Sequence, residues 1–482
     1  MDRRSFLGGS LAAAGGIVLG GSGLRDLTLT RSRPRRPAPE RLLDLPAADA
    51  PIDTVVVVMM ENRSFDHLLG WMADDHRYLE EGKRRHGADF HVIGSTHERY
   101  RAPDGKDHPT RNVLALETAD PLRGCSYGVP GHSWKNGRVQ RDQGFLAQGS
   151  GNDDYAITYF DGKAFPDHRA VAENFTVLDR YHASLLGPTF PNRQYLHSAQ
   201  SEGRKSDPGP MKTGIYQAET IWDRLAAAGV PATYYYTDLP MLSLWGTRMK
   251  AYMAPLDRYF EQAAAGTLPR FSMLEPSFTG DLRADAHPQG NVLLAVAFFA
   301  HVLDALARSP QWSRSMFVLA HDEWGGFYDH VPPPILPDDR ASHRDADNFG
   351  QAGFRAAAAL VSPYAAANAV DHTVYDHTSI MRFLEWRFLG APASGPGRDS
   401  GKWWLTKRDR FAHPIGQTLL AKPANLEVPD ALVTPKPTSG ATPACAPGTA
   451  SLAEDSFRTD PSFEEERARD YPEATYRPWE PT

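Results

Sequence analysis

Cysteine and long apolar runs are both scarce in this chain of 482 residues. Its two cysteines, Cys125 and Cys445, are too few for a disulfide framework, and their pairing outside the cytoplasm is left open. After the N-terminal segment, no stretch approaches the ~20 apolar residues that a transmembrane helix needs. Neither sign of charge dominates, because the formal net charge is only -7. Such a balance gives no general attraction to nucleic acid, and we expect no nucleic-acid partner.

The composition is otherwise that of a globular protein rich in loops. Hydrophobic residues make up 41% of the chain and charged residues 23%, with 39 prolines and 40 glycines. The length admits one large α/β domain or two ordinary ones, so burial of a core is not limiting.

The N-terminus has the layout of a twin-arginine export signal. Arg3 and Arg4 precede an apolar run, rich in glycine and alanine, that ends near Gly23. A membrane anchor is the alternative, but the run is short and glycine-rich for a transmembrane helix. We predict a signal peptide at residues 1–30, used by the twin-arginine translocation machinery, and export to the periplasm, cell envelope or exterior.

Composition divides the remaining chain into three parts. Residues 31–51, rich in proline, arginine and alanine, are typical of a linker. Residues 52–420 form the predicted catalytic domain, and residues 421–482 form a tail that is first proline-rich and then acidic. Inside the domain, apolar runs at 52–60, 316–320 and 357–361 indicate strands buried on both faces, whereas 220–226 and 293–303 have helical patterns. Their alternation predicts an α/β fold.

Two pairs of side chains with oxygen donors follow two of the predicted strands. Glu61 and Asn62 come after the first strand, and Asp322 and Glu323 come after the strand at 316–320. Ligands of open α/β sheets bind outside the carboxyl ends of the strands, and hard oxygen donors at two such ends suit a divalent cation. These donors fit calcium, magnesium or manganese, and zinc is not excluded. Helix capping by Asn62 and Ser64, or carboxylates in solvent, is the structural alternative.

Thr189 stands where a helix is expected to begin. It precedes Pro191, which is tolerated in a first turn, and a helix-compatible stretch at 194–199. Free backbone N–H groups at a helix N-terminus favour phosphate and a threonine alkoxide, although a threonine in this position is more often a simple cap.

Together the motifs resemble the bacterial phosphoesterase family of phospholipases C and related acid phosphatases, with plant non-specific phospholipases C as relatives. The four segments that carry the resemblance are Glu61 to His67, Pro188 to Arg193, Asp322 to His330, and Tyr375 to Ser379. The resemblance implies an alkaline-phosphatase-like sandwich with a mostly parallel sheet and helices on both faces. It also implies a metal held by Glu61, Asn62, Thr189, Asp322 and Glu323, with Thr189 as nucleophile.

The same resemblance suggests roles for several further residues. His287, His132 and His330 are candidate catalytic residues beside Glu323, with His287 the first choice of general acid and His132 the second. Asn192, Arg193, His377 and Trp324 are candidate substrate-binding residues. Trp324 departs from the family, which often has histidine there. Together with Trp134, Tyr155 and Tyr159 it could form a choline-binding wall, although such aromatics more often only pack.

The predicted function is that of an exported phospholipase C that meets its phospholipid substrate at a membrane surface. It would cleave the glycerol-side phosphodiester of lipids such as phosphatidylcholine through a metal-activated Thr189. An exported acid phosphatase of the same family is the first alternative, and a non-catalytic phosphate- or headgroup-binding protein is the second.

Overall fold

The computed structural model describes residues 40–118, 120–209, 211–395, 403–432, 444, 445, 465 and 469. The chain divides into a unit of residues 1–39 and a unit of residues 40–482. The predicted signal peptide at 1–30, most of the predicted linker and most of the predicted tail therefore lie outside the described residues. Among the described helices, none is long and apolar enough to cross a membrane.

The described ends of the second unit pack on its core. Residues 40–51, which the sequence assigns to the linker, form two short 3-10 helices, and Leu42 is buried. The Leu42 N–H donates to the Leu419 carbonyl at 2.9 Å, and Ala421 N–H donates to the Glu40 carbonyl at 3.0 Å. The described part of the predicted tail thus lies against the start of the domain.

One eight-stranded sheet forms the core, in the order β12-β6-β11-β10-β1-β9-β7-β8. Its strands are β1 (Thr54–Met60), β6 (Thr176–Leu178), β7 (Ala232–Tyr236), β8 (Met253–Pro255), β9 (Phe271–Leu274), β10 (Ser315–His321), β11 (Ala358–Val361) and β12 (Ala369–Asp371). All neighbouring strands are parallel except at β11, which runs antiparallel to both β10 and β6. The mostly parallel sheet is confirmed.

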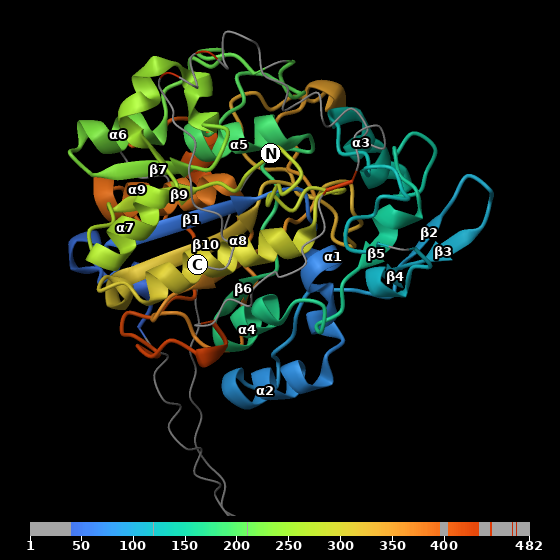
Figure 1. The fold of residues 1–482 in the computed structure, drawn as a ribbon, viewed down its shortest axis with the longest axis horizontal. Helices are drawn as coiled ribbons and strands as arrows, with labels where there is room; N and C mark the ends of the chain where they lie inside the picture. The colour runs from blue at the N-terminus through green and yellow to red at the C-terminus, as the bar shows by residue number, and fades with distance from the viewer. Residues whose placement is uncertain are drawn as a thin grey trace, which may run out of the picture. The chain divides into compact units, whose positions relative to one another are not determined.

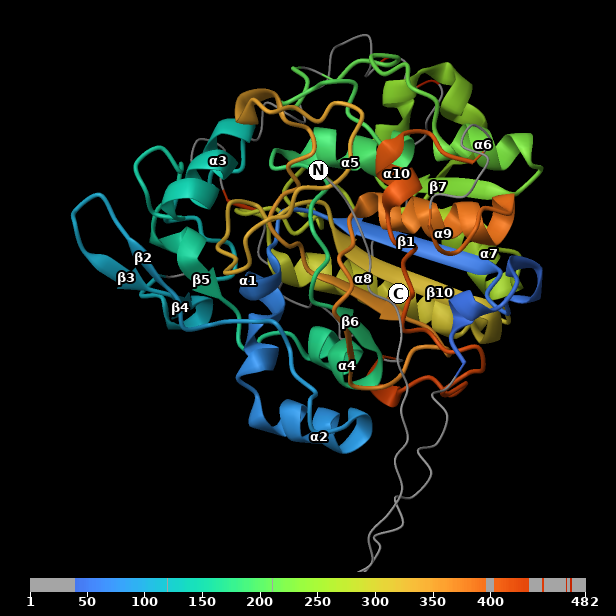
Figure 2. The ribbon, with the colours of Figure 1, turned by 180° about the vertical axis from the view of Figure 1, so that it is seen from behind.

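Helices cover the two faces of this sheet, among them the two longest, α8 (Val292–Ala307) and α9 (His377–Leu389), as Figure 1 and Figure 2 show from opposite sides. The other α-helices of the sandwich are α4 (Pro166–Asn174), α5 (Thr189–Ser198), α6 (Ile221–Ala227), α7 (Asp257–Ala265) and α10 (Lys407–Phe411). Helix α8 packs with α4 and α7, and α9 packs with α5, α6 and α10. The predicted sandwich with helices on both faces is therefore confirmed.

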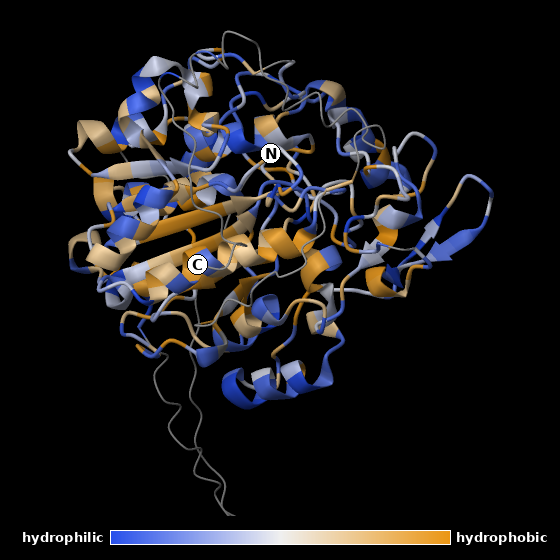
Figure 3. Cartoon of the chain, viewed as in Figure 1, coloured by the Kyte–Doolittle hydropathy of each residue, from blue (hydrophilic) through white to orange (hydrophobic). Residues whose placement is uncertain are grey.

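The pattern of the central strands explains their position. Every residue of β1 and of β10 is buried, because both strands have apolar neighbours on either face. Figure 3 shows these two strands as hydrophobic, in contrast to the hydrophilic helix α2 (His76–His86). The predicted strands at 52–60, 316–320 and 357–361 and the predicted helices at 220–226 and 293–303 are all confirmed within a few residues.

Smaller elements lie outside the sandwich. They are α1 (Phe65–Leu69), α3 (Trp134–Gln143), the antiparallel pair β2 (Arg99–Arg101) and β3 (Asp107–Pro109), and the parallel pair β4 (Arg111–Asn112) and β5 (Thr158–Tyr159). Figure 1 shows β2 and β3 as an extension beside β4 and β5.

A disulfide joins Cys125 to Cys445, a pairing that the sequence leaves open. The Cys445 N–H donates to the Gln289 carbonyl at 2.9 Å, and the Gln289 N–H donates to the Arg123 carbonyl at 2.9 Å. The loop around Gln289 is thus held between two distant segments of the chain.

Candidate active site

The pairs Glu61–Asn62 and Asp322–Glu323 lie side by side because β1 and β10 are parallel neighbours. Their register pairs Met60 with His321, so the residues that follow each strand leave the sheet together. The Asp322 N–H donates to the Met60 carbonyl at 3.0 Å, and Asp322 Oδ1 accepts from the Asn62 N–H at 3.0 Å. Glu61, Asn62, Asp322 and Glu323 are all fully buried.

Thr189 joins this cluster from a third element. It is the first residue of α5, and its hydroxyl donates to Asn62 Oδ1 at 3.1 Å. The residue before it, Pro188, occupies the N-cap position and has no side chain that could accept a capping bond. The Thr189 hydroxyl is instead committed to the cluster, and the side chain is only 3% exposed. The expected helix start is confirmed.

The backbone around Asn62 is unusually constrained. Asn62 has a φ of 56°, in the left-handed region that few side chains other than Asn and Asp adopt readily. Gly325 also has a positive φ, of 66°, and a Cβ there would lie 2.2 Å from the Asn62 carbonyl oxygen. The two strand-end loops therefore approach so closely that only glycine fits at this position. By contrast, Ser64 is an ordinary cap, because its Oγ accepts from the His67 N–H at the start of α1.

Arg193 supplies the counter-charge beneath the cluster. Its Nε donates to Asp322 Oδ2 at 3.0 Å, its Nη1 donates to Glu275 Oε1 at 2.5 Å, and its Nη2 lies 3.5 Å from Glu61 Oε1. Burial alone would lower the pKa of Arg193, but these three carboxylates raise it above its ordinary value. Arg193 is 3% exposed and saturated by carboxylates, which makes it a support for the cluster. Asn192 has a comparable place, since its side chain binds the backbone of Leu185 and Gly187 and folds the loop before Thr189.

The cluster contains more carboxylate groups than cationic side chains that face them. Burial raises the pKa of Glu61 and of Glu323 well above the usual range, and that of Asp322 above its usual value; Arg193 opposes this most strongly at Glu61 and Asp322. The Asp322 charge raises the pKa of Glu323 further. One arginine therefore does not neutralise the group.

Some carboxylate oxygens of the same cluster have no hydrogen bond, which fits a bound cation. Among the described residues, no hydrogen-bond partner reaches either carboxylate oxygen of Glu61 or Oε1 of Glu323. Buried carboxylates normally gain a hydrogen bond, a counter-ion or a metal. Over the same described part of the chain, no three His, Cys, Asp or Glu side chains are grouped to hold a metal by themselves. The oxygens of Asn62 and Thr189 would have to complete such a donor set.

Two histidines meet beside Glu323. The rings of His132 and His287 are 5.9 Å apart, and His132 Nε2 lies 4.0 Å from Glu323 Oε1. Each Nδ1 faces a backbone carbonyl, that of Pro130 at 2.8 Å and that of Pro288 at 2.9 Å. A carbonyl can only accept, so Nδ1 carries the proton and Nε2 keeps its lone pair. Burial lowers the pKa of both rings, and that of His287 lies well below its ordinary value.

The other predicted site residues, His330, His377 and Trp324, make contacts elsewhere than between His132 and His287. His330 Nδ1 lies 2.5 Å from Asp66 Oδ2. His377 Nε2 donates to the Asp322 carbonyl at 2.6 Å and so holds the strand-end loop from behind. Trp324 is fully buried and donates from its indole N–H to Gln140 Oε1 at 2.8 Å.

Three acidic residues that the sequence reasoning missed also surround the site. Glu275 directly follows β9, as Glu61 follows β1. It was missed because this short strand was not recognised from the sequence. Asp285 accepts from the His287 N–H at 2.9 Å and supplies an acid two residues before that histidine. Asp207 Oδ1 accepts from the Phe190 N–H at 2.9 Å, beside Thr189, and no sequence signal marks it.

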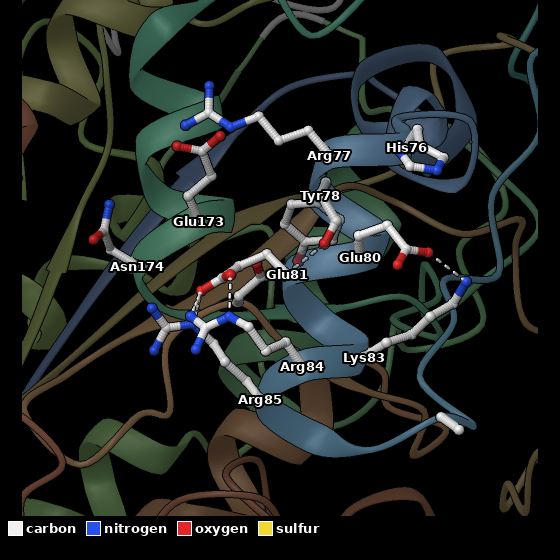
Figure 4. A pocket seen from close by; sticks show the side chains of 12 residues that line it. His76, Arg77, Tyr78, Glu80, Glu81, Lys83, Arg84, Arg85, Glu173 and Asn174 are labelled. Carbon is white, nitrogen blue, oxygen red and sulfur yellow. Dashed lines mark hydrogen bonds and ion pairs between the residues drawn. The ribbon is translucent and has the colours of Figure 1, made fainter.

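A separate cavity of about 1010 Å³ lies at α2 and contains none of these residues. Figure 4 shows its charged lining, in which Lys83 pairs with Glu80, and Arg84 and Arg85 pair with Glu81. Its charges are largely matched within the helix, so the buried cluster at Thr189 is the candidate active site.

Comparison with known proteins bears on this cluster. The model of the Phosphoesterase family matches residues 52–389, a span that includes every residue of the cluster. The chain belongs to this family. The phosphoesterase is 29% identical to non-specific phospholipase C6 of Arabidopsis thaliana over 76% of this chain and 73% of that protein. It is also 27% identical to phospholipase C B of Mycobacterium tuberculosis, over 93% of this chain and 91% of that protein. These findings identify this phosphoesterase as a hydrolase of phosphoric diesters.

Solved structures give weaker similarity. A protein in the alkaline phosphatase superfamily from Vibrio parahaemolyticus aligns with a TM-score of 0.29 and 10% identity, over 48% of this chain and 67% of that one. The PsFucS1 sulfatase from Pseudoalteromonas sp. aligns with a TM-score of 0.34 and 10% identity, over 77% of this chain and 75% of that one.

Proposed function

We propose that this phosphoesterase is an exported phospholipase C with Thr189 as its nucleophile. It would hydrolyse the glycerol-side phosphodiester of phospholipids such as phosphatidylcholine, releasing diacylglycerol and the phosphorylated headgroup. The observation that carries the proposal is the Thr189 hydroxyl, 3.1 Å from Asn62 Oδ1, in a cluster where buried carboxylate oxygens of Glu61 and Glu323 have no hydrogen bond. The phospholipase C names of the relatives support the choice of substrate.

Glu61, Asn62, Asp322, Glu323 and Thr189 would hold a divalent cation, which when bound lowers the pKa of the threonine hydroxyl and offsets phosphate charge. The oxygens of Glu61 and Glu323 that have no hydrogen bond favour this donor set, and hard oxygen donors suit calcium, magnesium or manganese. At the start of α5 the Phe190 N–H already donates to Asp207 Oδ1 and Pro191 has no N–H, so these two positions offer no donor to a phosphate.

The reaction would proceed through a covalent phosphothreonine diester that still carries the headgroup. The Thr189 oxygen forms a bond to phosphorus as the bond from phosphorus to the glyceryl oxygen breaks. The glyceryl oxygen takes up a proton and leaves as diacylglycerol. Water then attacks the phosphothreonine, which releases the phosphorylated headgroup and restores the hydroxyl.

His287, with His132 beside it, would move the proton. The free Nε2 of a neutral imidazole accepts the proton that Thr189 loses and then delivers it to the leaving glyceryl oxygen. The lowered pKa of both histidines favours the neutral form that this first transfer requires.

Export rests on two observations. Arg3 and Arg4 precede an apolar run. The disulfide between Cys125 and Cys445 is of a kind that persists in oxidising compartments. Replacing both arginines by lysine should retain the precursor in the cytoplasm, as measured by fractionation, whereas unchanged export would point to another route.

Parallel assays on phosphatidylcholine and on a small phosphomonoester test the function. We expect diacylglycerol and phosphocholine from the lipid, and loss of both in Thr189→Val. Release of inorganic phosphate from the monoester with intact lipid would indicate an acid phosphatase instead. Binding of either compound without any product would indicate a binding protein, and phosphatidic acid would show cleavage of the other ester bond.

A further inference from the structure

A loop of residues 201–209 borders the nucleophile. Its Asp207 accepts a hydrogen bond from the Phe190 N–H at 2.9 Å, immediately after Thr189. Two residues earlier, Lys205 extends toward the opposite rim of the site, where α3 begins at Trp134. The loop therefore joins the nucleophile to a cluster of aromatic residues.

The Lys205 ammonium occupies a cage of aromatic rings and oxygens. Its Nζ lies 5.2 Å from the centroid of Trp134 and 5.9 Å from that of Phe349. It donates to the Ala346 carbonyl at 2.7 Å and to Asp347 Oδ1 at 2.6 Å. Two ring faces with a carboxylate and a carbonyl are the groups that hold an ammonium ion, including the quaternary ammonium of choline.

The cage lies next to the reacting centre and is accessible to water. Trp134 covers Gly187, because a Cβ at Gly187 would lie 3.4 Å from the Trp134 ring. Gly187 is two residues before Thr189, and His132 is two residues before Trp134. The side chain of Lys205 is 35% exposed. A headgroup whose phosphate reaches Thr189 would therefore pass this cage.

We propose that Lys205 determines headgroup specificity by filling an ammonium subsite with the enzyme's own cation. This inference rests on the proposed phospholipase C function and concerns the substrate class of the same site. A second ammonium cannot share the cage with Lys205, and the Arg138 guanidinium, 3.8 Å from the same Trp134 ring, adds further positive charge. Phosphatidylcholine then remains a substrate but is cleaved less efficiently than phospholipids with neutral or anionic headgroups. Without the lysine, the rings and Asp347 become available to choline.

Replacement of Lys205 tests the proposal through headgroup selectivity. The measured quantity is kcat/KM on phosphatidylcholine divided by kcat/KM on phosphatidylglycerol, both in the same neutral detergent micelles. We expect this ratio to rise about tenfold in Lys205→Ala, which corresponds to about 1.4 kcal/mol and lies within the usual range of cation–π contacts. Lys205→Gln should also raise it, since the amide keeps a donor for the Ala346 carbonyl and lacks the charge.

Lys135→Ala is the matched control. Lys135 is exposed on the same rim, next to Trp134, and its replacement removes the same charge without emptying the cage. Its ratio should equal that of the wild type. An equal rise in Lys135→Ala would attribute the effect to the net charge of the rim and overturn the inference, as would an unchanged ratio in both Lys205 variants.

Binding of tetramethylammonium separates this inference from the proposed function. Calorimetry on the full-length protein should detect binding to Lys205→Ala at least about tenfold tighter than to the wild type, and Trp134→Leu in the same background should abolish it. Equal binding by Lys205→Ala and the wild type would overturn the cage, whatever the enzyme cleaves. Absence of lipid hydrolysis together with tight binding would instead refute the phospholipase C function and leave the cage intact.

Discussion

Replacing Thr189 by valine isolates the contribution of its hydroxyl. Valine keeps the branched shape and the buried volume, so no cavity forms, but Asn62 Oδ1 loses the donor that lies 3.1 Å away. Leaving one buried acceptor without a partner costs about 1–3 kcal/mol of stability. A domain stable by about 5–15 kcal/mol should therefore remain folded. Catalysis should fall far more, because no phosphothreonine can form.

The expected loss of kcat is at least about a thousandfold, equivalent to about 4 kcal/mol of transition-state stabilisation. Thr189→Ser keeps the hydroxyl and should retain part of the activity, because only the methyl group that restricts its rotamer is lost. Acid quench during turnover of phosphatidylcholine, followed by peptide mass analysis, should locate phosphocholine on Thr189 of the wild type and no adduct on the corresponding peptide of Thr189→Val. Turnover by Thr189→Val close to that of the wild type would refute the reasoning and indicate a water nucleophile.

Three further outcomes follow from other contacts. Glu61→Gln should weaken divalent-cation binding by tenfold or more, since loss of even an outer-shell partner typically costs that much; unchanged metal content in the purified variant would exclude this donor. Burial lowers the pKa of His330, but the hydrogen bond and charge of Asp66 outweigh burial and raise that pKa above its ordinary value. The ion pair of protonated His330 with Asp66 therefore stabilises the fold fully below about pH 6.5, and this stabilisation is lost as the pH rises through the raised pKa. His330→Asn should accordingly lower Tm more at pH 6 than at pH 9, and an equal loss at both would contradict the ion pair. Cys445→Ser removes a link to Cys125 across 320 residues and should lower the free energy of unfolding by up to about 5 kcal/mol in denaturant titrations. Reductant should lower the stability of the wild type by the same amount and leave that of the variant unchanged.

Long apolar strands and the residues directly after them were predictable from the sequence. β1 and β10 are uninterrupted runs, and their ends bear Glu61 and Asp322, which meet because the strands are adjacent. The short strands β6, β7, β8, β9 and β12 were missed because none is an uninterrupted apolar run: each contains a Thr, Ser, Pro or Asp, unlike β11, which is equally short but wholly apolar. Glu275, at the end of β9, was missed with its strand.

Other parts of the site depend on tertiary contacts that no local pattern encodes. Arg193 is expected at the substrate from its motif, but its position among three carboxylates follows from the packing of α5 against the strand ends. Asp207 and Lys205 lie in a polar loop that resembles any other exposed loop in the sequence. Their relation to Thr189 and Trp134 is visible only in the folded chain.

The pairing of β1 with β10 ties recognition to the folding of the whole domain. Glu61 and Asp322 are brought together by strands separated by more than 250 residues of sequence, so an unfolded or partly folded chain has no such site. Anything that binds there binds the native state alone, and it stabilises that state in proportion to the logarithm of its concentration. At a hundred times its Kd, such a ligand adds about 2.7 kcal/mol, so thermal shift reports occupancy of this site even for a compound that is never turned over.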